Sequence, residues 1–177
     1  MVVKFEPYKP WSGNDDNLIV KGKIEAIGSP TEKIVFTSID DDEYGGDTKN
    51  DGITTSISYW NRIHFTPEAA TSTFQNVIIS YGGLTGLGWY PYLGVVYVEK
   101  NSVIFEDVYF KNNGPSAYTL YLENSTSTVR NSIFENSWIA INIVGQDQNV
   151  FENNAFQNCN CYVMKDNQCI SPISSLP

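Results

Sequence analysis

Short runs of β-branched and aromatic residues alternate with polar residues along nearly the whole chain, and helical periodicity is rare. Four segments share one pattern: an apolar residue, a polar residue, Asn or Asp, two variable residues and an apolar residue. These segments cover residues 74–79, 105–110, 129–134 and 151–156, and their first residues lie 31, 24 and 22 positions apart. The pattern predicts strands in a unit that repeats roughly every 20 to 24 residues.

A second short apolar segment precedes each of these four, at 63–65, 96–98, 120–122 and 141–143. Turns of the Asn-Gly type, which join hairpin strands, are largely missing between the segments. The unit is also too rich in strand residues for a leucine-rich repeat. We therefore expect an all-β protein in which each strand stacks on its equivalent one repeat later, a parallel β-helix (solenoid) of about six coils.

Stacking of the four segments predicts which side chains become neighbours. The inner file would hold Phe74, Phe105, Val129 and Phe151. An outer file would hold Gln75, Glu106, Arg130 and Glu152, so that Arg130 lies between two glutamates. A further file would place Lys111 against Glu135. Opposite charges at adjacent positions support this alignment.

Asparagine is abundant, with 18 residues, and its positions follow the repeat. Two columns are predicted at the bends between strands, namely Asn76, Asp107, Asn131 and Asn153, and Asn112, Asn136 and Asn158. A side-chain amide both donates and accepts hydrogen bonds, so amides in such a column can bond to one another. Asn also tolerates the left-handed backbone that tight bends need. We interpret both columns as structural.

The segments 18–28, 33–38, 41–48, 59–65 and 79–83 recur in this order in a known group of proteins. On these residues the chain resembles the right-handed parallel β-helix repeat proteins of bacterial and archaeal cell surfaces, which share a pectate-lyase-like fold. The resemblance covers residues 18–83 well, and the remainder only as generic repeats. It implies a right-handed solenoid and an extracellular location. It says little about activity, because such folds carry adhesins, structural stalks, lyases and hydrolases alike.

Length, composition and charge limit the remaining possibilities. The 177 residues suffice for one domain, with an acidic insertion at 40–58, a glycine-rich aromatic loop at 82–94 and a cysteine-containing end at 159–177. The net charge of -9 argues against binding to nucleic acid and to anionic membrane surfaces. The apolar density of residues 77–98 is too low for a membrane span. Residues 2–5 resemble a strand inside a longer array, which predicts a longer parent protein or end-to-end assembly.

Six carboxylates fall within residues 40–51, separated by glycines. Close oxygen ligands of this kind suit Ca²⁺. The full EF-hand pattern fails, because Lys49 stands at a middle ligand position. The sequence thus leaves two hypotheses, a solvated acidic insertion and a looser calcium site formed by Asp40, Asp42, Asp47 and Asp51.

Aromatic side chains in the loop at 82–94 are candidates for stacking on sugar rings, namely Trp89, Tyr90 and Tyr92. The alternative, which we favour, is that the loop folds back over the flank of the strands. His64 lies on a strand with its apolar neighbours turned the other way, so an exposed or corner position is expected rather than a catalytic one. No catalytic residue is predicted.

The three cysteines lie at positions 159, 161 and 169. A Cys-x-Cys pair bonded to itself is strained, so a disulfide from Cys169 to Cys161 or Cys159 is the better interpretation, with Cys161 the preferred partner. Reduced, buried thiols are the alternative. Asn124 begins a glycosylation sequon that is expected at the surface.

These observations predict a non-catalytic extracellular protein, either a structural or adhesive segment or a self-assembling subunit of a cell surface or filament. A carbohydrate-binding module is the first alternative, with a glycan as partner. A polysaccharide lyase or hydrolase is the second alternative.

Overall fold

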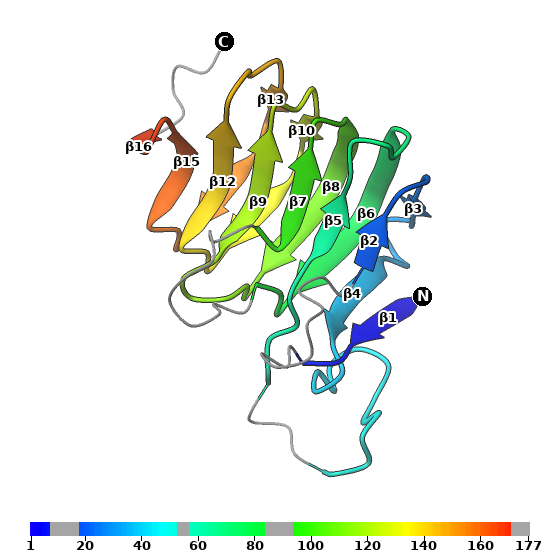
Figure 1. Ribbon diagram of the computed structural model, residues 1–177. Coiled ribbons are helices and arrows are strands. Elements are labelled where there is room, and N and C mark those ends of the chain that lie inside the picture. Colours follow the sequence, from blue (N-terminus) through cyan, green and yellow to red (C-terminus); the bar gives the residue numbers. More distant parts are fainter. Residues whose placement is uncertain (8–17, 53–56, 84–93, 171–177) are drawn as a thin grey trace.

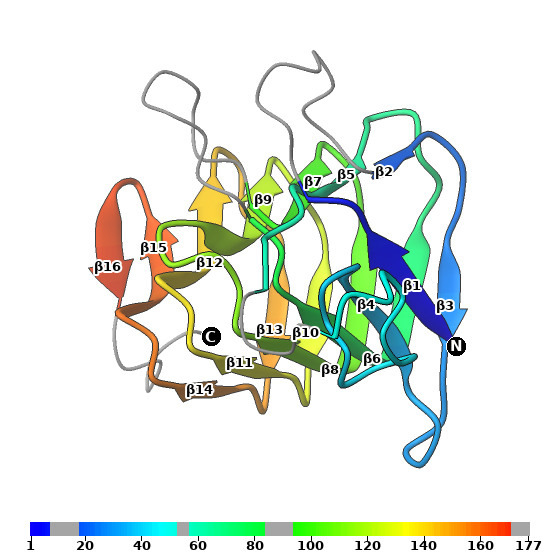
Figure 2. The ribbon, with the colours of Figure 1, turned by 90° about the horizontal axis from the view of Figure 1, so that it is seen from below.

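The computed structural model of the protein describes residues 1–7, 18–52, 57–83 and 94–170. Sixteen strands form two sheets, and no helix occurs among these residues (Figure 1). None of the described segments is a helix long and apolar enough to cross a membrane. The two sheets face each other across the interior, as Figure 2 shows, and the chain passes repeatedly from one to the other.

The first sheet has nine strands with the main order β1-β4-β6-β8-β10-β13. Its members are β1 (Val2–Phe5), β3 (Glu25–Ile27), β4 (Ile34–Ser38), β6 (Ser72–Ser80), β8 (Val103–Lys111), β10 (Thr128–Arg130), β11 (Ile133–Glu135), β13 (Val150–Glu152) and β14 (Ala155–Gln157). The long strands β6 and β8 each pair with two shorter strands, which follow one another along the chain.

The second sheet has seven strands in the order β16-β15-β12-β9-β7-β5-β2. They are β2 (Leu18–Val20), β5 (Ile63–Phe65), β7 (Val96–Glu99), β9 (Tyr118–Glu123), β12 (Ile139–Val144), β15 (Cys161–Lys165) and β16 (Gln168–Ile170). All neighbours in this sheet are parallel except β15 and β16, which form an antiparallel pair.

The predicted register is confirmed. Phe74 pairs with Phe105, Phe105 with Val129 and Val129 with Phe151. The first three of these side chains are fully buried, and Phe151, on an edge strand, is half-buried. Because the side chains alternate between the two faces of a strand, this register directs one apolar file inward along the whole sheet.

The expected architecture needs a correction. The chain is all-β, but the right-handed parallel β-helix of about six coils is wrong, because the strands belong to two distinct sheets of nine and seven strands with mixed pairing. The units are also unequal. Strands β6 and β8 run unbroken through a bend that later units divide between β10 and β11 and between β13 and β14. The spacing of a sequence pattern predicts which residues pair, but it does not determine how strands are divided between sheets or where the chain reverses.

The core lies between the sheets and is rich in phenylalanine. The rings of Phe110 and Phe134 stack with centroids 4.6 Å apart, and Phe134 and Phe156 stack at 5.3 Å. An edge-to-face contact of Phe65 with Phe74, at 5.9 Å between centroids, joins the two sheets. Rings at these separations add packing energy to the burial of apolar surface.

Removal of one ring from the inner file tests this packing. Phe105→Ala should lower the free energy of unfolding by about 3–5 kcal/mol, because the cavity cannot close between neighbouring rings. Ile104→Ala, at the adjacent outward and half-exposed position, should lower it by only about 1 kcal/mol. Urea denaturation of both variants measures the difference. Equal losses would contradict the assignment of Phe105 to the interior.

Candidate functional site

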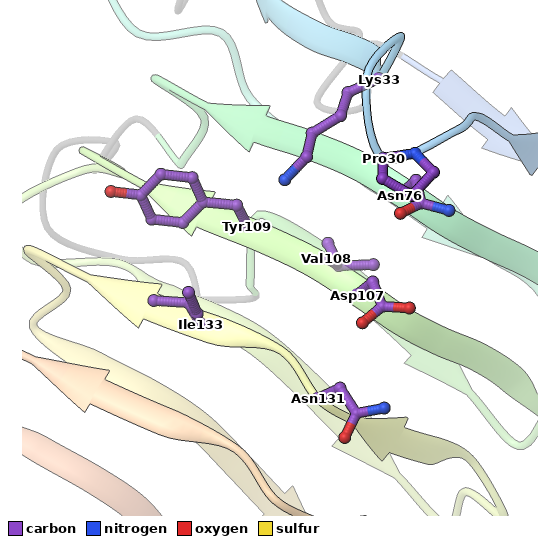
Figure 3. A pocket seen from close by; sticks show the side chains of 8 residues that line it. All are labelled: Pro30, Lys33, Asn76, Asp107, Val108, Tyr109, Asn131 and Ile133. Atoms are coloured by element: carbon purple, nitrogen blue, oxygen red, sulfur yellow. The ribbon is translucent and has the colours of Figure 1, made fainter.

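A surface hollow of about 350 Å³ lies beside a bend of the nine-stranded sheet (Figure 3). We call it the bend groove. It is lined by Pro30, Lys33, Asn76, Asp107, Val108, Tyr109, Asn131 and Ile133. The lining combines one ammonium group, one carboxylate, two amides and an aromatic ring, so the groove can offer hydrogen bonds and apolar contact to the same molecule.

The bend itself is formed by residues with left-handed backbone. Asn76 on β6 and Asp107 on β8 have φ angles of 51° and 54°. The buried side chains of Val108 and Phe110 point inward, so Tyr109 between them points outward. Figure 3 shows Asn76, Asp107 and Asn131 in one row along the bend, with Tyr109 further along β8.

One wall of the bend groove is the turn that connects β3 to β4. The Gly28 amide donates a hydrogen bond to the carbonyl of Gln75 at 2.8 Å, and Asn76 Nδ2 donates to the Gly28 carbonyl at 3.2 Å. A Cβ atom at Gly28 would lie 2.6 Å from the Asn76 carbonyl oxygen, so only glycine permits this contact. The turn thereby holds Pro30 and Lys33 against the bend.

Asp107 interrupts a column of amides. Asn76 directs its amide to Gly28, and Asn131 accepts a hydrogen bond from Asn153 at 3.5 Å. Arg130 interacts with Asp107 only through charge attraction, because its guanidinium donates its hydrogen bond to Glu106 Oε2 at 2.9 Å. Within the described residues, the ammonium of Lys33 has no hydrogen bond or ion pair, and the carboxylate of Asp107 has only the charge attraction to Arg130. Both groups could therefore contact a ligand without breaking a hydrogen bond to a described residue.

The pairing predicted for Lys111 is corrected by the structure. Lys111 is next to Glu135 in the register, but its ammonium donates to Glu43 Oε2 at 3.1 Å and to the Tyr44 hydroxyl at 3.0 Å. The hydroxyl of Tyr109 bonds to Glu135 instead. Burial lowers the pKa of Lys111, but the bonds to Tyr44 and Glu43 outweigh burial and raise it overall. This contact ties the acidic insertion to the nine-stranded sheet.

The four aspartates proposed as calcium ligands do not converge. Asp40 forms an ion pair with Lys49 and accepts a hydrogen bond from the Ser58 amide at 3.0 Å. Asp47 accepts hydrogen bonds from the amides of Asp51 and Gly52 at 3.3 and 3.0 Å. No group of three or more potential metal ligands occurs among the described residues. Calcium binding by Asp40, Asp42, Asp47 and Asp51 stays a prediction that this geometry does not favour.

His64 belongs to a second polar cluster, on the outer face of the seven-stranded sheet. Its Nε2 lies 3.1 Å from Glu99 Oε2, and its ring stacks on Tyr97 with centroids 4.5 Å apart. The Tyr97 hydroxyl donates to Glu123 Oε2 at 2.5 Å, and Glu99 and Glu123 are partners in the register. Burial raises the pKa of Tyr97, and the bond to Glu123 raises it further. The outward position of His64 was expected, whereas its partners were not.

The remaining predicted sites are the aromatic loop, the disulfide and the glycosylation sequon. Trp89, Tyr90 and Tyr92 lie outside the described residues, so the sugar platform proposed for them stays a prediction. Cys161 and Cys169 form a disulfide with Cα atoms 5.8 Å apart, the pairing that the sequence favours. Asn124 is exposed, and its side-chain oxygen accepts a hydrogen bond from the Gln146 amide at 3.0 Å. Its glycosylation is untested.

Comparison of the chain with protein-family models, with curated proteins and with solved structures finds no match. The resemblance to cell-surface repeat proteins therefore remains an expectation from the sequence.

The bend groove was not predicted, although the sequence contained one signal of it. Asp107 is the single acid in its predicted column of asparagines. Lys33, from a turn 74 positions earlier, and the outward Tyr109 could not be assigned to the same place without the folded structure.

The ion pair between Asp40 and Lys49 predicts that the folded state becomes less stable at acidic pH. Burial raises the pKa of Asp40, but hydrogen bonds from Lys49 and Ser58 outweigh burial and lower it below 3.8. A lowered carboxyl pKa stabilises the folded state at neutral pH, and this stability disappears as the pH falls through the lowered pKa. Asp40→Asn should lower the free energy of unfolding by about 1 kcal/mol at pH 7 and by less at an acidic pH below the lowered pKa of Asp40.

Denaturation curves measured across this pH range test the prediction. Asp42→Asn is the matched control, because Asp42 carries the same charge in the same segment but does not take part in the ion pair with Lys49. An Asp40→Asn variant whose loss of stability is equal at both pH values would contradict the role of the ion pair.

Proposed function

We propose that the chain is a non-catalytic structural or adhesive segment of an extracellular protein. The observation that carries the proposal is the ladder of hydrogen bonds between side chains on adjacent strands. Asn136 Nδ2 donates to Asn112 Oδ1 at 2.7 Å, and Asn158 Nδ2 donates to Asn136 Oδ1 at 3.2 Å. All three residues have φ angles near 53°. The amides therefore fix one bend of the sheet across successive strands, which favours a rigid body over a mobile active site.

Charged and polar side chains outside the bends also form hydrogen bonds between adjacent strands. Gln75 Nε2 donates to Glu106 Oε2 at 3.3 Å, and Arg130 donates to the same oxygen at 2.9 Å. The carboxylate of Asp147 accepts hydrogen bonds from Lys165 Nζ at 3.1 Å and from Asn149 Nδ2 at 2.9 Å. Exposed pairs of this kind add little stability one at a time, but a connected row restrains the strands it links.

An extracellular location is supported by the disulfide between Cys161 and Cys169, because disulfides persist mainly in oxidising compartments. The likeness of residues 18–83 to cell-surface proteins and the exposed sequon at Asn124 agree with such a location. The structural role does not depend on them.

The ends of the seven-stranded sheet differ in their capacity for assembly. At one end β16 pairs antiparallel with β15 and covers its edge. At the other end β2 pairs, among the described strands, only with β5. A second copy of the chain could therefore not continue the parallel pairing of the seven-stranded sheet at the β16 end without displacing β16. This disfavours an end-to-end filament in which each copy continues the parallel pairing of the strands.

The asparagine ladder can be tested by two substitutions at one position. Asn136→Gly removes the amide but keeps a residue that tolerates φ near 53°, whereas Asn136→Ala removes the amide and keeps a Cβ atom without the local hydrogen bonds that let asparagine adopt this conformation. We expect Gly to lower the free energy of unfolding by about 1 kcal/mol through loss of the amide hydrogen bonds, and Ala to lower it by about 1–2 kcal/mol more than Gly. Asn160→Ala, at an exposed position without positive φ, is the control and should change stability little. If Gly and Ala are equal, the bend is not maintained by this residue.

The non-catalytic role is tested by incubation with polysaccharides. With Ca²⁺ present, purified protein should release neither ultraviolet-absorbing products nor new reducing ends from polyuronates and neutral glycans. A heat-denatured sample sets the background. Accumulation of either product above that background would contradict the proposal and favour the lyase or hydrolase.

A further inference from the structure

We propose that the bend groove binds a single neutral sugar ring of a glycan. This inference rests on the adhesive role and names its ligand class. It uses residues other than Trp89, Tyr90 and Tyr92, so the two carbohydrate sites are independent hypotheses.

The polar groups of the bend groove match a ring that carries adjacent hydroxyl groups. A hydroxyl both donates and accepts hydrogen bonds. The two oxygens of Asp107 can accept from neighbouring hydroxyls, while Lys33 and the amide of Asn131 can donate to hydroxyl oxygens. Because the side chains of Asp107 and Lys33 form no hydrogen bond with the described residues, a ligand would not need to break such a bond. Hydrogen bonds that involve a charged group are the stronger ones.

The apolar groups of the bend groove match the other part of a sugar, its C–H surface. The ring of Tyr109 is held outward by its bond to Glu135, and Ile133 lies beside it on the neighbouring strand β11. Pro30 contributes apolar surface from the facing turn, as Figure 3 shows. An aromatic ring with such neighbours suits a ligand that is apolar on one face and polar at its edge.

Size and charge narrow the ligand class. A hollow of about 350 Å³ lies near the lower limit for small-molecule sites, which suits one ring. The groove holds a single carboxylate, and no group of three or more His, Cys, Asp or Glu side chains that could hold a metal occurs among the described residues, so a calcium ion is not the expected ligand. The net charge of -9 and the carboxylate of Asp107 disfavour an anionic sugar, because like charges across an interface repel. A neutral sugar needs no cluster of carboxylate ligands and carries no charge that Asp107 would repel.

Binding can be measured by titrating ¹⁵N-labelled protein with methyl glycosides of glucose, galactose, mannose and N-acetylglucosamine. Concentrations should reach about 50 mM, because a few weak contacts give millimolar dissociation constants. We expect at least one neutral glycoside to shift the amide resonances of Asp107, Tyr109 and Asn131. The methyl glycoside of galacturonic acid, an anionic probe, should bind more weakly than that neutral glycoside.

The decisive variant is Asp107→Asn. Asparagine already occupies the equivalent positions 76, 131 and 153 with the same backbone conformation, so the variant should fold. Loss of the carboxylate should weaken binding about tenfold or more. Lys33→Gln should also weaken it. Glu152→Gln is the control, since it removes one negative charge from an exposed position outside the groove and should leave affinity unchanged.

Three results would overturn the inference: no shift at these amides with any neutral glycoside, equal affinity of the Asp107→Asn variant, or tighter binding of the anionic probe. Each leaves the structural, non-catalytic role standing, because polysaccharide turnover and the ladder variants test that role separately. Conversely, turnover of a polysaccharide would refute the non-catalytic role without affecting binding measured at the bend groove.

Discussion

Parallel, in-register pairing of neighbouring strands is the constraint on which the rest of this structure depends. Once Phe74 lies beside Phe105 and Phe105 beside Val129, every other residue of these strands also meets its equivalent. Apolar side chains then form continuous inward files, and outward positions form files of their own. Core packing and surface chemistry are therefore two consequences of one register.

The bends show how the same register yields both a hydrogen-bonded ladder and the bend groove. At one bend, Asn112, Asn136 and Asn158 bond to one another and restrain three successive strands. At the other, the column contains Asp107, whose carboxylate cannot donate to a neighbouring amide in the way asparagine does. The ladder is interrupted there, beside the turn that carries Lys33, and the bend groove lies at this interruption. A single acid within a column of asparagines thus changes the surface chemistry of one bend while the strand register is kept.

Two ion pairs of the protein involve the acidic insertion and do not follow from the repeat. Lys111 lies beside Glu135 in the sheet but bonds to Glu43 of the acidic insertion, and Asp40 within that insertion pairs with Lys49. These contacts satisfy the insertion's carboxylates individually instead of gathering them around a cation. Partners 68 positions apart, such as Glu43 and Lys111, share no sequence pattern that would reveal them.

The sequence by itself determined the class of secondary structure, the pairing register and the positions of the left-handed asparagines, because each follows from local periodicity and from residue type. It also supported the bond between Cys161 and Cys169. Only the tertiary structure decided the division into two sheets, the antiparallel return of β16 and the convergence of Lys33, Asp107 and Tyr109 at the bend groove. Those features depend on where segments distant in the chain meet in space, and a periodic pattern contains no information about such meetings.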